Sequence, residues 1–297
     1  MSISFSVIIP TYNRLDLLRS TLESIPESGE DIEIIVIDDG STDGTWEYLR
    51  TRSDIISIQQ KNSGPGAARN RGIEAASNSY IAFLDSDDLW FPWSLQFYRT
   101  VIESSKAKVI FGCPLKFTDE FNEAICSEPP SAPHWNVFSD YFSSGDVWRW
   151  WSASSFVIHR DTVGNARFLE TPVNGEDADF ILQLGHENSL AQVVETPTFG
   201  YREHAGSIML NSEKTVSGAR TMLDKELSNQ YPGGATRAPE RRRIIMRHLR
   251  PVILNMMKQG DPAQGWEFFR KSFKWHLQQK RLKFILGVLA LRLKSND

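Results

Sequence analysis

The feature of this sequence that most constrains its fold is an alternation of apolar runs and helical segments over about the first 90 residues. The run "FSVIIPTYNR" is rich in β-branched residues and predicts a buried strand, and the leucines of "LDLLRSTLESI" follow at helical spacing. The alternation continues to a fourth apolar run, which predicts a parallel sheet covered by helices on both faces. Strands are expected at 5–14, 32–44, 55–60 and 80–88, and helices at 15–25, 44–52 and 64–76.

The residues at the ends of these strands are the ones suited to chemistry. In sheets of this kind, ligands bind beyond the carboxyl ends of the strands. Here those ends are Thr11–Asn13, Asp38–Asp39 and Asp85–Asp88. The sequence therefore predicts a functional site along one edge of the sheet.

The stretch "YIAFLDSDDLWFP" brings three carboxylates, Asp85, Asp87 and Asp88, within four positions. Such closely spaced acids raise one another's pKa unless a cation lies among them. Asp85 and Asp87 form a D-x-D motif that suits Mg²⁺ or Mn²⁺ held together with substrate phosphate oxygens. The alternative is a solvated acidic turn in which Asp88 caps the following helix. The motif alone leaves both interpretations open.

Two further motifs are also ambiguous when taken singly. In "VIDDGSTDG" a carboxylate at the strand end can accept hydrogen bonds from a base or a ribose, but the composition is equally that of a turn. In "NSGPGAARNRG", Gly64 and Gly66 allow close backbone approach, and Arg69 and Arg71 can pair with phosphate at a helix N-terminus. This motif matches neither the Walker P-loop nor the dinucleotide fingerprint.

Taken together, the segments "SVIIPTYNR", "VIDDGSTDGT", "NSGPGAARNRGIEAA" and "YIAFLDSDD" resemble, in order and spacing, the family 2 glycosyltransferases of the GT-A fold. The resemblance covers residues 4–95 closely and extends more loosely to about residue 210 through "GEDADF" and "YREHAGSI". It implies an α/β fold with a nucleotide-binding, Rossmann-like mixed sheet flanked by helices. We expect a GT-A domain over 1–213 and a helical, basic C-terminal appendage over 214–297.

The resemblance also implies roles for individual residues. Asp39 would accept a hydrogen bond from a uracil N–H, and Asp87 would be the more direct ligand of a Mn²⁺ or Mg²⁺ ion, with Asp85 beside it. His204, in "YREHAGS", would reach the metal or the diphosphate; a lone histidine can equally be structural. The nucleotide-binding set implied in this way is Pro10, Thr11, Tyr12, Asp39, Arg69, Asn70, Asp85 and Ser86.

By the same resemblance, "GEDADF" carries the catalytic base, with Asp177 under the acceptor hydroxyl and Glu176 beside it. An attacking hydroxyl must lose its proton, and a positioned base typically contributes about 10²–10⁴-fold to the rate. Repulsion among Glu176, Asp177 and Asp179 would raise the pKa of one of them. The alternative is that these acids complement the dipole at a helix N-terminus.

The implied activity is inverting transfer of a sugar from a nucleotide-diphosphate donor, a UDP-sugar, to the hydroxyl of a saccharide or lipid-linked saccharide. This activity would serve the biosynthesis of a surface polysaccharide or glycoconjugate. Two alternatives remain. A sugar-nucleotide pyrophosphorylase would need an N-terminal Gly-rich loop with a lysine, where this chain has "PTYNR". A catalytically degenerate protein of the same fold would only bind a nucleotide or a polysaccharide.

The C-terminal region differs from the rest in charge. Residues 237–297 hold 15 Lys and Arg against 4 Asp and Glu, although the whole chain has a net charge of −4. Breaks at 231–234 and 259–265 divide a helical pattern. We expect a helical bundle with basic residues facing water; a peripheral membrane contact through 237–297 and a surface for an anionic polymer are the alternatives. No nucleic-acid-binding motif is present, so we expect no nucleic acid partner.

Composition and targeting signals indicate where such a protein works. The two cysteines, Cys113 and Cys126, do not suggest a disulfide framework, and the N-terminus lacks the pattern of a signal peptide. We expect a cytoplasmic protein, with the inner face of the membrane as a peripheral site. Trp148, Trp150 and Trp151 either stack on a sugar or pack in the core, and we expect core packing for at least one.

Overall fold

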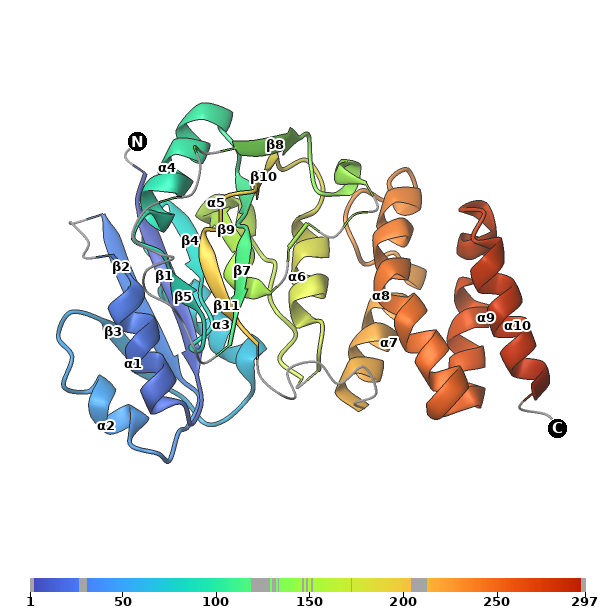
Figure 1. Cartoon of the computed structure of the whole chain (residues 1–297), viewed down its shortest axis with the longest axis horizontal. Coiled ribbons are helices and arrows are strands. Elements are labelled where there is room, and N and C mark those ends of the chain that lie inside the picture. The colour runs from blue at the N-terminus through green and yellow to red at the C-terminus, as the bar shows by residue number, and fades with distance from the viewer. Residues whose placement is uncertain are drawn as a thin grey trace. The chain divides into compact units, whose positions relative to one another are not determined.

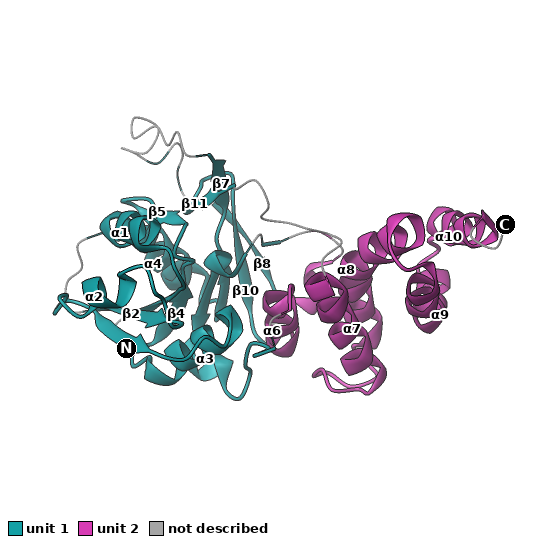
Figure 2. Ribbon diagram, turned by 90° about the horizontal axis from the view of Figure 1, so that it is seen from below, with its two compact units in different colours: residues 1–140, 148–172, 187–205 teal, residues 141–147, 173–186, 206–297 magenta. Residues whose placement is uncertain are grey.

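The computed structural model describes residues 3–26, 31–118, 129, 132, 134–145, 147, 149–150, 152–171, 173–203 and 213–294. The chain divides into two compact units, coloured separately in Figure 2. Unit 1 comprises residues 1–140, 148–172 and 187–205, and unit 2 comprises residues 141–147, 173–186 and 206–297. The domain boundary predicted at residue 213 stays a prediction. The two compact units do not meet at a single boundary, because the internal segments 141–147 and 173–186 belong to unit 2.

Unit 1 is built on an eight-stranded mixed sheet of order β3-β2-β1-β4-β9-β6-β10-β8 (Figure 1). The first four strands of the chain lie side by side and run parallel, as the alternation predicted. Strand β9 runs antiparallel to both β4 and β6, which makes the sheet mixed. The strands are β1 Phe5–Thr11, β2 Ile32–Asp38, β3 Ile56–Gln59, β4 Tyr80–Phe83, β6 Val109–Phe111, β8 His134–Phe138, β9 Phe156–His159 and β10 Leu190–Val194.

A second, three-stranded sheet of order β5-β11-β7 completes unit 1. It consists of β5 Leu89–Trp90, β7 Pro114–Phe117 and β11 Phe199–Arg202. The segments "KAKVIFGCPLKF" and "QVVETPTFGYREH" each form two strands that belong to different sheets. Gly112 lies between the two strands of the first pair, where a Cβ would lie 2.5 Å from the Tyr98 hydroxyl.

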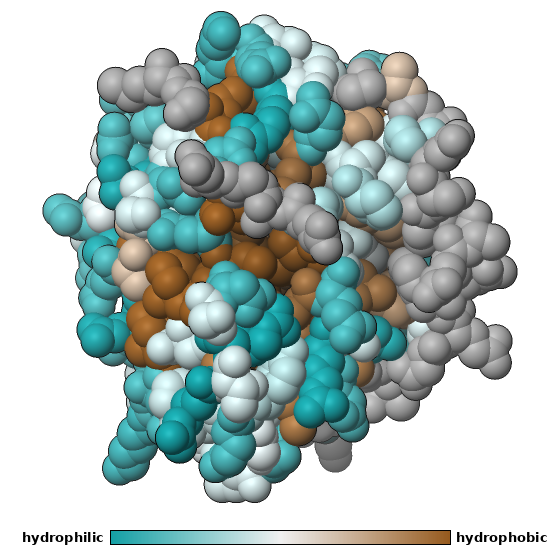
Figure 3. All heavy atoms as spheres, turned by 90° about the vertical axis from the view of Figure 1, so that its left-hand side faces the viewer, coloured by the Kyte–Doolittle hydropathy of each residue, from teal (hydrophilic) through white to brown (hydrophobic). Residues whose placement is uncertain are grey.

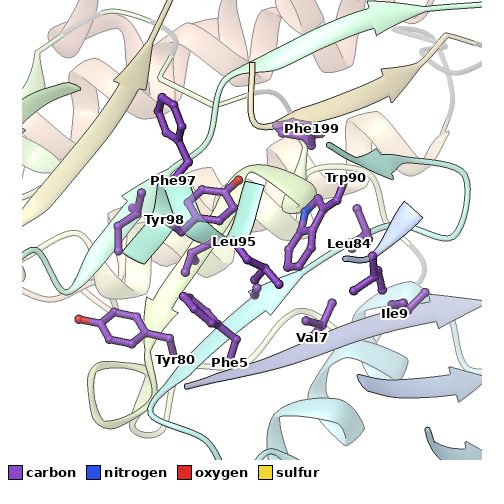
Figure 4. Packing of buried hydrophobic residues seen from close by; sticks show 14 of the residues in the cluster. Phe5, Val7, Ile9, Tyr80, Leu84, Trp90, Leu95, Phe97, Tyr98 and Phe199 are labelled. Carbon is purple, nitrogen blue, oxygen red and sulfur yellow. The ribbon is translucent and has the colours of Figure 1, made fainter. Parts of the chain in front are cut away.

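Central strand β1 is buried along its whole length because helices cover both of its faces. One face packs against α1 (Leu15–Ser24) and α4 (Ser94–Ser105), and Figure 4 shows this cluster. On the other face lies α3 (Pro65–Ala75), which approaches so closely that a Cβ on Gly72 would lie 2.3 Å from Ile8. The sheet therefore holds the strand ends in fixed positions.

The side of the molecule at the left of Figure 1, where α1, β2 and β3 lie, is seen face-on in Figure 3. Hydrophilic residues surround a band of hydrophobic ones on this face. More than half of the accessible surface of an ordinary folded protein comes from apolar atoms. Ile56 of the edge strand β3, for example, is 42% exposed.

Unit 2 consists of helices α6 Glu176–Leu184, α7 Glu213–Leu227, α8 Ala238–Gln259, α9 Pro262–Gln278 and α10 Leu282–Lys294. Both predicted breaks, at 231–234 and 259–265, are confirmed. A further break separates α9 from α10, where Lys280 takes a left-handed backbone conformation. The expected bundle is confirmed for α8 and α9, whose buried apolar side chains form its core.

The expectation that the basic residues of this bundle face water is wrong for Arg241, which is fully buried. Its guanidinium donates to the buried carboxylate of Glu226 at 2.8 Å and to the carbonyl oxygens of Pro232 and Gly234. A buried charge is tolerated only when it is paired and hydrogen-bonded in this way. The pair therefore fixes the "YPGG" turn to the end of α7.

His276 is also buried in the bundle, between the rings of Phe269 and Phe284. Burial, together with the charges of Arg250 and Arg281, lowers the pKa of His276 to about 4. In the unfolded chain, His276 therefore binds a proton near its ordinary pKa of about 6.5. In the folded chain it does not bind one until about pH 4. His276 stabilises the fold fully above about pH 6.5, and this contribution is lost as the pH falls.

We therefore expect the free energy of unfolding to fall by about 2 kcal/mol, because of His276, when the pH is lowered from about 7.5 to about 5. His276→Phe removes the titration, while Ser272 keeps its hydrogen bond to the Phe268 carbonyl. Urea unfolding followed by circular dichroism at both pH values should show a smaller pH dependence in the variant. An equal pH dependence in both proteins would contradict this account.

Candidate functional site

The segment that follows β1 is tied to the turn that follows β2. Asn13 has φ of +50°, a left-handed conformation that asparagine tolerates. Its backbone N–H donates to the Ser41 hydroxyl at 2.9 Å, and its side-chain oxygen accepts from the Thr42 N–H at 2.7 Å. The ends of β1 and β2 therefore form one connected rim at the edge of the sheet.

Three predicted nucleotide contacts, Pro10, Thr11 and Tyr12, lie on this rim. Pro10 is buried beyond the last β1–β4 pair, so its missing N–H removes no bond from that ladder. The hydroxyl of Thr11 is buried and finds no hydrogen-bond partner among the described residues. Tyr12, by contrast, is 46% exposed. A buried hydroxyl without a partner is unusual, and it marks this strand end as a place where a polar ligand group fits.

Asp39 is almost fully buried at the end of β2 and ties down the loop that precedes α3. Its Oδ1 accepts from the Gln60 side chain at 2.8 Å and from the Ser63 N–H at 2.9 Å. Its Oδ2 accepts from the Gly64 N–H at 2.8 Å. Each carboxylate oxygen has two lone pairs, so Oδ2 keeps the capacity to accept one more donor.

Gly66 and Arg71 of the glycine-rich segment have contacts of their own within unit 1. Gly66 lies inside α3, where a Cβ would come within 2.0 Å of the Leu169 carbonyl oxygen, so close packing within unit 1 requires this glycine. Arg71 pairs with Glu74 on the exposed side of the helix. Gly64 precedes the helix with φ of +91°, as expected for a turn glycine.

Asn70 is buried on α3 and holds the backbone of the neighbouring segment. Its side-chain amide donates to the Phe168 carbonyl at 2.9 Å and accepts from the Phe168 N–H at 2.8 Å, and it also contacts Glu170. These contacts position the segment that contains Phe168. The nucleotide contact predicted for Asn70 stays a prediction.

The carboxylates of the D-x-D motif are each paired with an arginine. Arg69 of α3 donates to Asp85 at 2.6 Å, and Arg14 donates to Asp87 at 2.7 Å. The Arg69 side chain is buried, and its guanidinium lies over the ring of Phe168. Two cationic side chains therefore already balance these two acids. Ser86, between the two acids, is buried.

Asp88 has a structural position and does not cap a helix. The next helix, α4, begins at Ser94, so the alternative of an Asp88 cap is wrong. Asp88 is buried and accepts from the Ser154 hydroxyl at 2.6 Å and from the Arg202 N–H at 3.0 Å. Burial, and then the charges of Asp85 and Asp87, raise the pKa of Asp88 well above its ordinary value. The rise in pKa that was predicted for closely spaced acids is therefore found at Asp88.

The second sheet brings Tyr201 and Arg202 beside these acids. Strand β11 pairs with β5, which directly follows Asp88. Arg202 is buried, donates through Nε to the Asp87 carbonyl at 3.0 Å, and lies over the ring of Phe117. Burial, followed by the charge of Asp88, raises the pKa of the neighbouring Tyr201 to about 12. Two segments more than 110 residues apart in sequence therefore meet at the acid cluster.

The donor chemistry of this edge fits a hard divalent cation. Among the described residues, no three His, Cys, Asp or Glu side chains gather closely enough to hold a metal ion by themselves. Mg²⁺ and Mn²⁺ need only one or two protein carboxylates when phosphate oxygens and water supply the other ligands. Asp85 and Asp87 offer two carboxylates, and their side chains are 21% and 13% exposed. Two carboxylates are the number that such an ion takes from a protein when a diphosphate is bound with it.

The predicted catalytic acids lie in unit 2, in the first turn of α6. Gly175 precedes the helix in a left-handed conformation, Glu176 begins it, and Asp177 accepts from the Ala178 N–H at 2.7 Å. Asp179 is different: it is fully buried and binds Lys225 at 2.7 Å and the Tyr231 hydroxyl at 2.7 Å. Asp179 is therefore a structural residue, and Lys225 balances its charge.

Two predicted positions lie outside the described residues, and one aromatic prediction is confirmed. His204 is outside the described part of the chain, as are Trp148 and Trp151. Trp150 is buried and packs edge-on against Phe156 of β9. The core role expected for at least one of these tryptophans is confirmed.

Sequence reasoning missed two residues that organise the acid cluster. Arg14 stands at the end of the quoted motif "PTYNR", and a basic residue at a strand end was a signal that could have identified it. Ser154 donates to Asp88 and accepts from the Asp85 N–H at 2.9 Å. Its contacts span more than 60 residues, and a serine in "SASS" carries no local signal for them.

Comparison with known sequences gives one family and several relatives. The family described as Glycosyl transferase family 2 matches residues 6–159. An uncharacterized glycosyltransferase of Rickettsia bellii is 43% identical over 230 residues, which are 76% of this chain and 33% of that protein. The chain thus spans about a third of the length of that relative. The Escherichia coli UDP-Glc:alpha-D-GlcNAc-diphosphoundecaprenol beta-1,3-glucosyltransferase WfaP is 30% identical over 215 residues, 71% of this chain and 82% of that protein.

Solved structures show the same fold. The S. aureus TarS fragment 1–349 in complex with UDP-GlcNAc superposes with a TM-score of 0.69 at 14% sequence identity, and the match covers 99% of this chain and 92% of that one. The mannosyltransferase PcManGT from Pyrobaculum calidifontis, in complex with GDP-Man and Mn²⁺, superposes with a TM-score of 0.52 at 13% identity, covering 99% and 88%. The mixed sheet of unit 1 is accordingly of the GT-A type.

Proposed function

Because the chain belongs to glycosyltransferase family 2, we propose that it transfers a sugar from a UDP-linked donor to an acceptor hydroxyl with inversion at the anomeric carbon. The observation that carries this proposal is the edge of the sheet in unit 1. There Asp85 and Asp87, each paired with an arginine, follow strand β4. The unsatisfied hydroxyl of Thr11 lies at the end of the neighbouring parallel strand β1. An acidic pair beside two arginines suits a diphosphate that is bound together with a divalent cation.

The donor is proposed to be a UDP-sugar on the basis of two of the proteins compared above, whereas another, PcManGT, was solved with GDP-Man. WfaP is named for UDP-Glc, and TarS was solved with UDP-GlcNAc. In this chain, Tyr12 offers an exposed ring to the base, and Asp39 keeps one lone pair for a uracil N–H. The proposed nucleotide-binding residues are Pro10, Thr11, Tyr12, Asp39, Arg69, Asn70, Asp85 and Ser86.

Asp87 and Asp85 would hold Mn²⁺ or Mg²⁺, and His204 is proposed as a further ligand. When bound, the ion would stabilise the negative charge of the departing diphosphate. A Mn²⁺ ion is present in the PcManGT complex, which supports this choice of ion. Arg14 and Arg69 hold the two carboxylates in place, and they are close enough to the motif to bind phosphate oxygens as well.

The chain's own contribution to the displacement is proton removal from the acceptor. We assign this step to Asp177, with Glu176 beside it, at the first turn of α6. The Asp177 carboxylate takes the proton of the acceptor hydroxyl as that oxygen attacks the anomeric carbon, and the bond to the diphosphate breaks on the opposite side. A single in-line displacement of this kind inverts the configuration.

The acceptor is proposed to be a saccharide or a lipid-linked saccharide. The name of WfaP describes an acceptor on diphosphoundecaprenol, which supports a role in surface polysaccharide or glycoconjugate biosynthesis. A lipid-linked acceptor would place the protein in the cytoplasm at the inner face of the membrane.

Slow hydrolysis of the donor tests this function without knowledge of the acceptor. We expect the purified chain to release UDP from a UDP-sugar in the presence of Mn²⁺, and EDTA to abolish the release. Renewed Mn²⁺ in excess of EDTA should restore it. Binding of UDP-sugars without any release, at every UDP-sugar tested, would instead indicate the catalytically degenerate alternative.

A further inference from the structure

Helix α10 of unit 2 carries an apolar stripe that no described residue covers. Four leucines, at positions 282, 286, 289 and 293, are 58%, 66%, 39% and 70% exposed. Their spacing of four, three and four residues places them on one face of the helix. At the end of α9, Phe273 and Leu277 are 36% and 52% exposed, also four residues apart.

This stripe is additional to the face that packs α10 into the bundle. Ile285 and Val288 are buried on the adjoining face of the helix. Phe284 contacts the rings of His276 and Phe269 on α9, with ring centroids 4.5 Å and 6.1 Å apart. The helix therefore already has a complete packing face. A helix held only by such packing would carry polar residues where these leucines stand.

The charge around the stripe identifies the kind of surface that it fits. Residues 268–294 contain eight Lys and Arg and no Asp or Glu. Lys283 and Lys294 are exposed on α10 itself, and Lys280 is exposed in the turn before it. An apolar stripe bordered by positive charge complements a surface that is apolar inside and anionic outside.

A second copy of the chain fits this surface less well. The leucine spacing would suit a short coiled coil, but the flanking positions of such a pair need opposite charges across the seam. With no acidic residue between 268 and 294, two copies would bring like charges together.

We propose that the exposed face of α10, with the end of α9, binds the surface of an anionic lipid bilayer. The leucines enter the boundary between headgroups and acyl chains, and the lysines and arginines contact anionic headgroups. No helix among the described residues is long and apolar enough to cross a membrane, so the contact lies along the surface. This inference stands on unit 2 alone and does not depend on the proposed transferase activity.

Vesicle flotation of the full chain tests the proposal. We expect the protein to float with vesicles of phosphatidylcholine and phosphatidylglycerol and to stay behind with pure phosphatidylcholine. The double variant Leu286→Gln with Leu293→Gln should lower partitioning into the anionic vesicles by at least about tenfold. Both side chains are mostly exposed, so the fold should be unaffected, which circular dichroism of the variant checks.

Leu227→Gln is the matched control, because Leu227 is an exposed leucine at the end of α7, outside the stripe. It should float like the unaltered chain. Absence of flotation with anionic vesicles would overturn the proposal, as would equal flotation of the double variant. A dimer that the double variant dissociates, without any vesicle binding, would assign the stripe to contact between copies and would also overturn it.

Discussion

Asp177→Asn is expected to lower the turnover of sugar transfer by about 10²–10⁴-fold while leaving the affinity for the donor unchanged. Asparagine matches aspartate in shape but accepts no proton at neutral pH. It is also well tolerated at a helix N-terminus, where Asp177 now accepts from the Ala178 N–H. The fold should therefore survive while the proposed base is lost.

The measurement compares single-turnover transfer and donor affinity in the variant and in the unaltered chain. Asp161→Asn is a matched control, because Asp161 is an exposed acid in the first turn of a short helix, α5 (Arg160–Val163). Unimpaired transfer by Asp177→Asn would remove Asp177 from its proposed role. Asp179 is unsuitable for such a test, because its buried contacts with Lys225 and Tyr231 would make any loss structural.

Asp87→Ala should weaken UDP binding in the presence of Mn²⁺ by at least about tenfold, which corresponds to about 1.4 kcal/mol of binding free energy. The substitution removes the proposed direct metal ligand and frees Arg14 from its ion pair. Because Asp87 is partly exposed and contacts Arg14 at the rim, the core should not change. The variant should bind UDP equally with and without Mn²⁺.

Asp54→Ala provides the comparison for that experiment. Asp54 forms an Arg–Asp pair of similar length with Arg52, in the segment that leads into the start of β3. The start of a parallel strand lies at the opposite edge of the sheet from its carboxyl end, so this pair lies away from the proposed site. Its removal should leave metal-dependent UDP binding intact. A similar loss in both variants would mean that the effect of Asp87→Ala is not local.

The sequence was sufficient to predict the edge of the sheet at which the candidate site lies. The alternation of apolar and helical segments places Thr11, Asp39 and Asp85 at or just after the ends of parallel strands, and these strands are neighbours in the sheet. Local patterns succeed here because strand order follows from short, right-handed connections. The breaks between α7, α8 and α9 could also be read from their Gly and Pro residues.

Contacts between distant segments could not be predicted in the same way. The division of 106–117 and 192–203 between two sheets depends on strand pairings between distant segments, which are a property of the assembled core. The bond of Ser154 to Asp88 and the pairing of Arg14 with Asp87 join residues more than 60 positions apart. In the helical unit, the buried position of Arg241 contradicts the general preference of arginine for water, because Glu226 and two carbonyls compensate it.

Calorimetric titration of UDP into the purified chain is the most direct test of the central idea that a divalent cation joins Asp85 and Asp87 to a nucleoside diphosphate. With saturating Mn²⁺ we predict a saturable heat with one UDP per chain, and with EDTA we predict a much weaker signal or none. If neither Mn²⁺ nor Mg²⁺ produces binding heat with UDP or with another nucleoside diphosphate, the proposed site is contradicted.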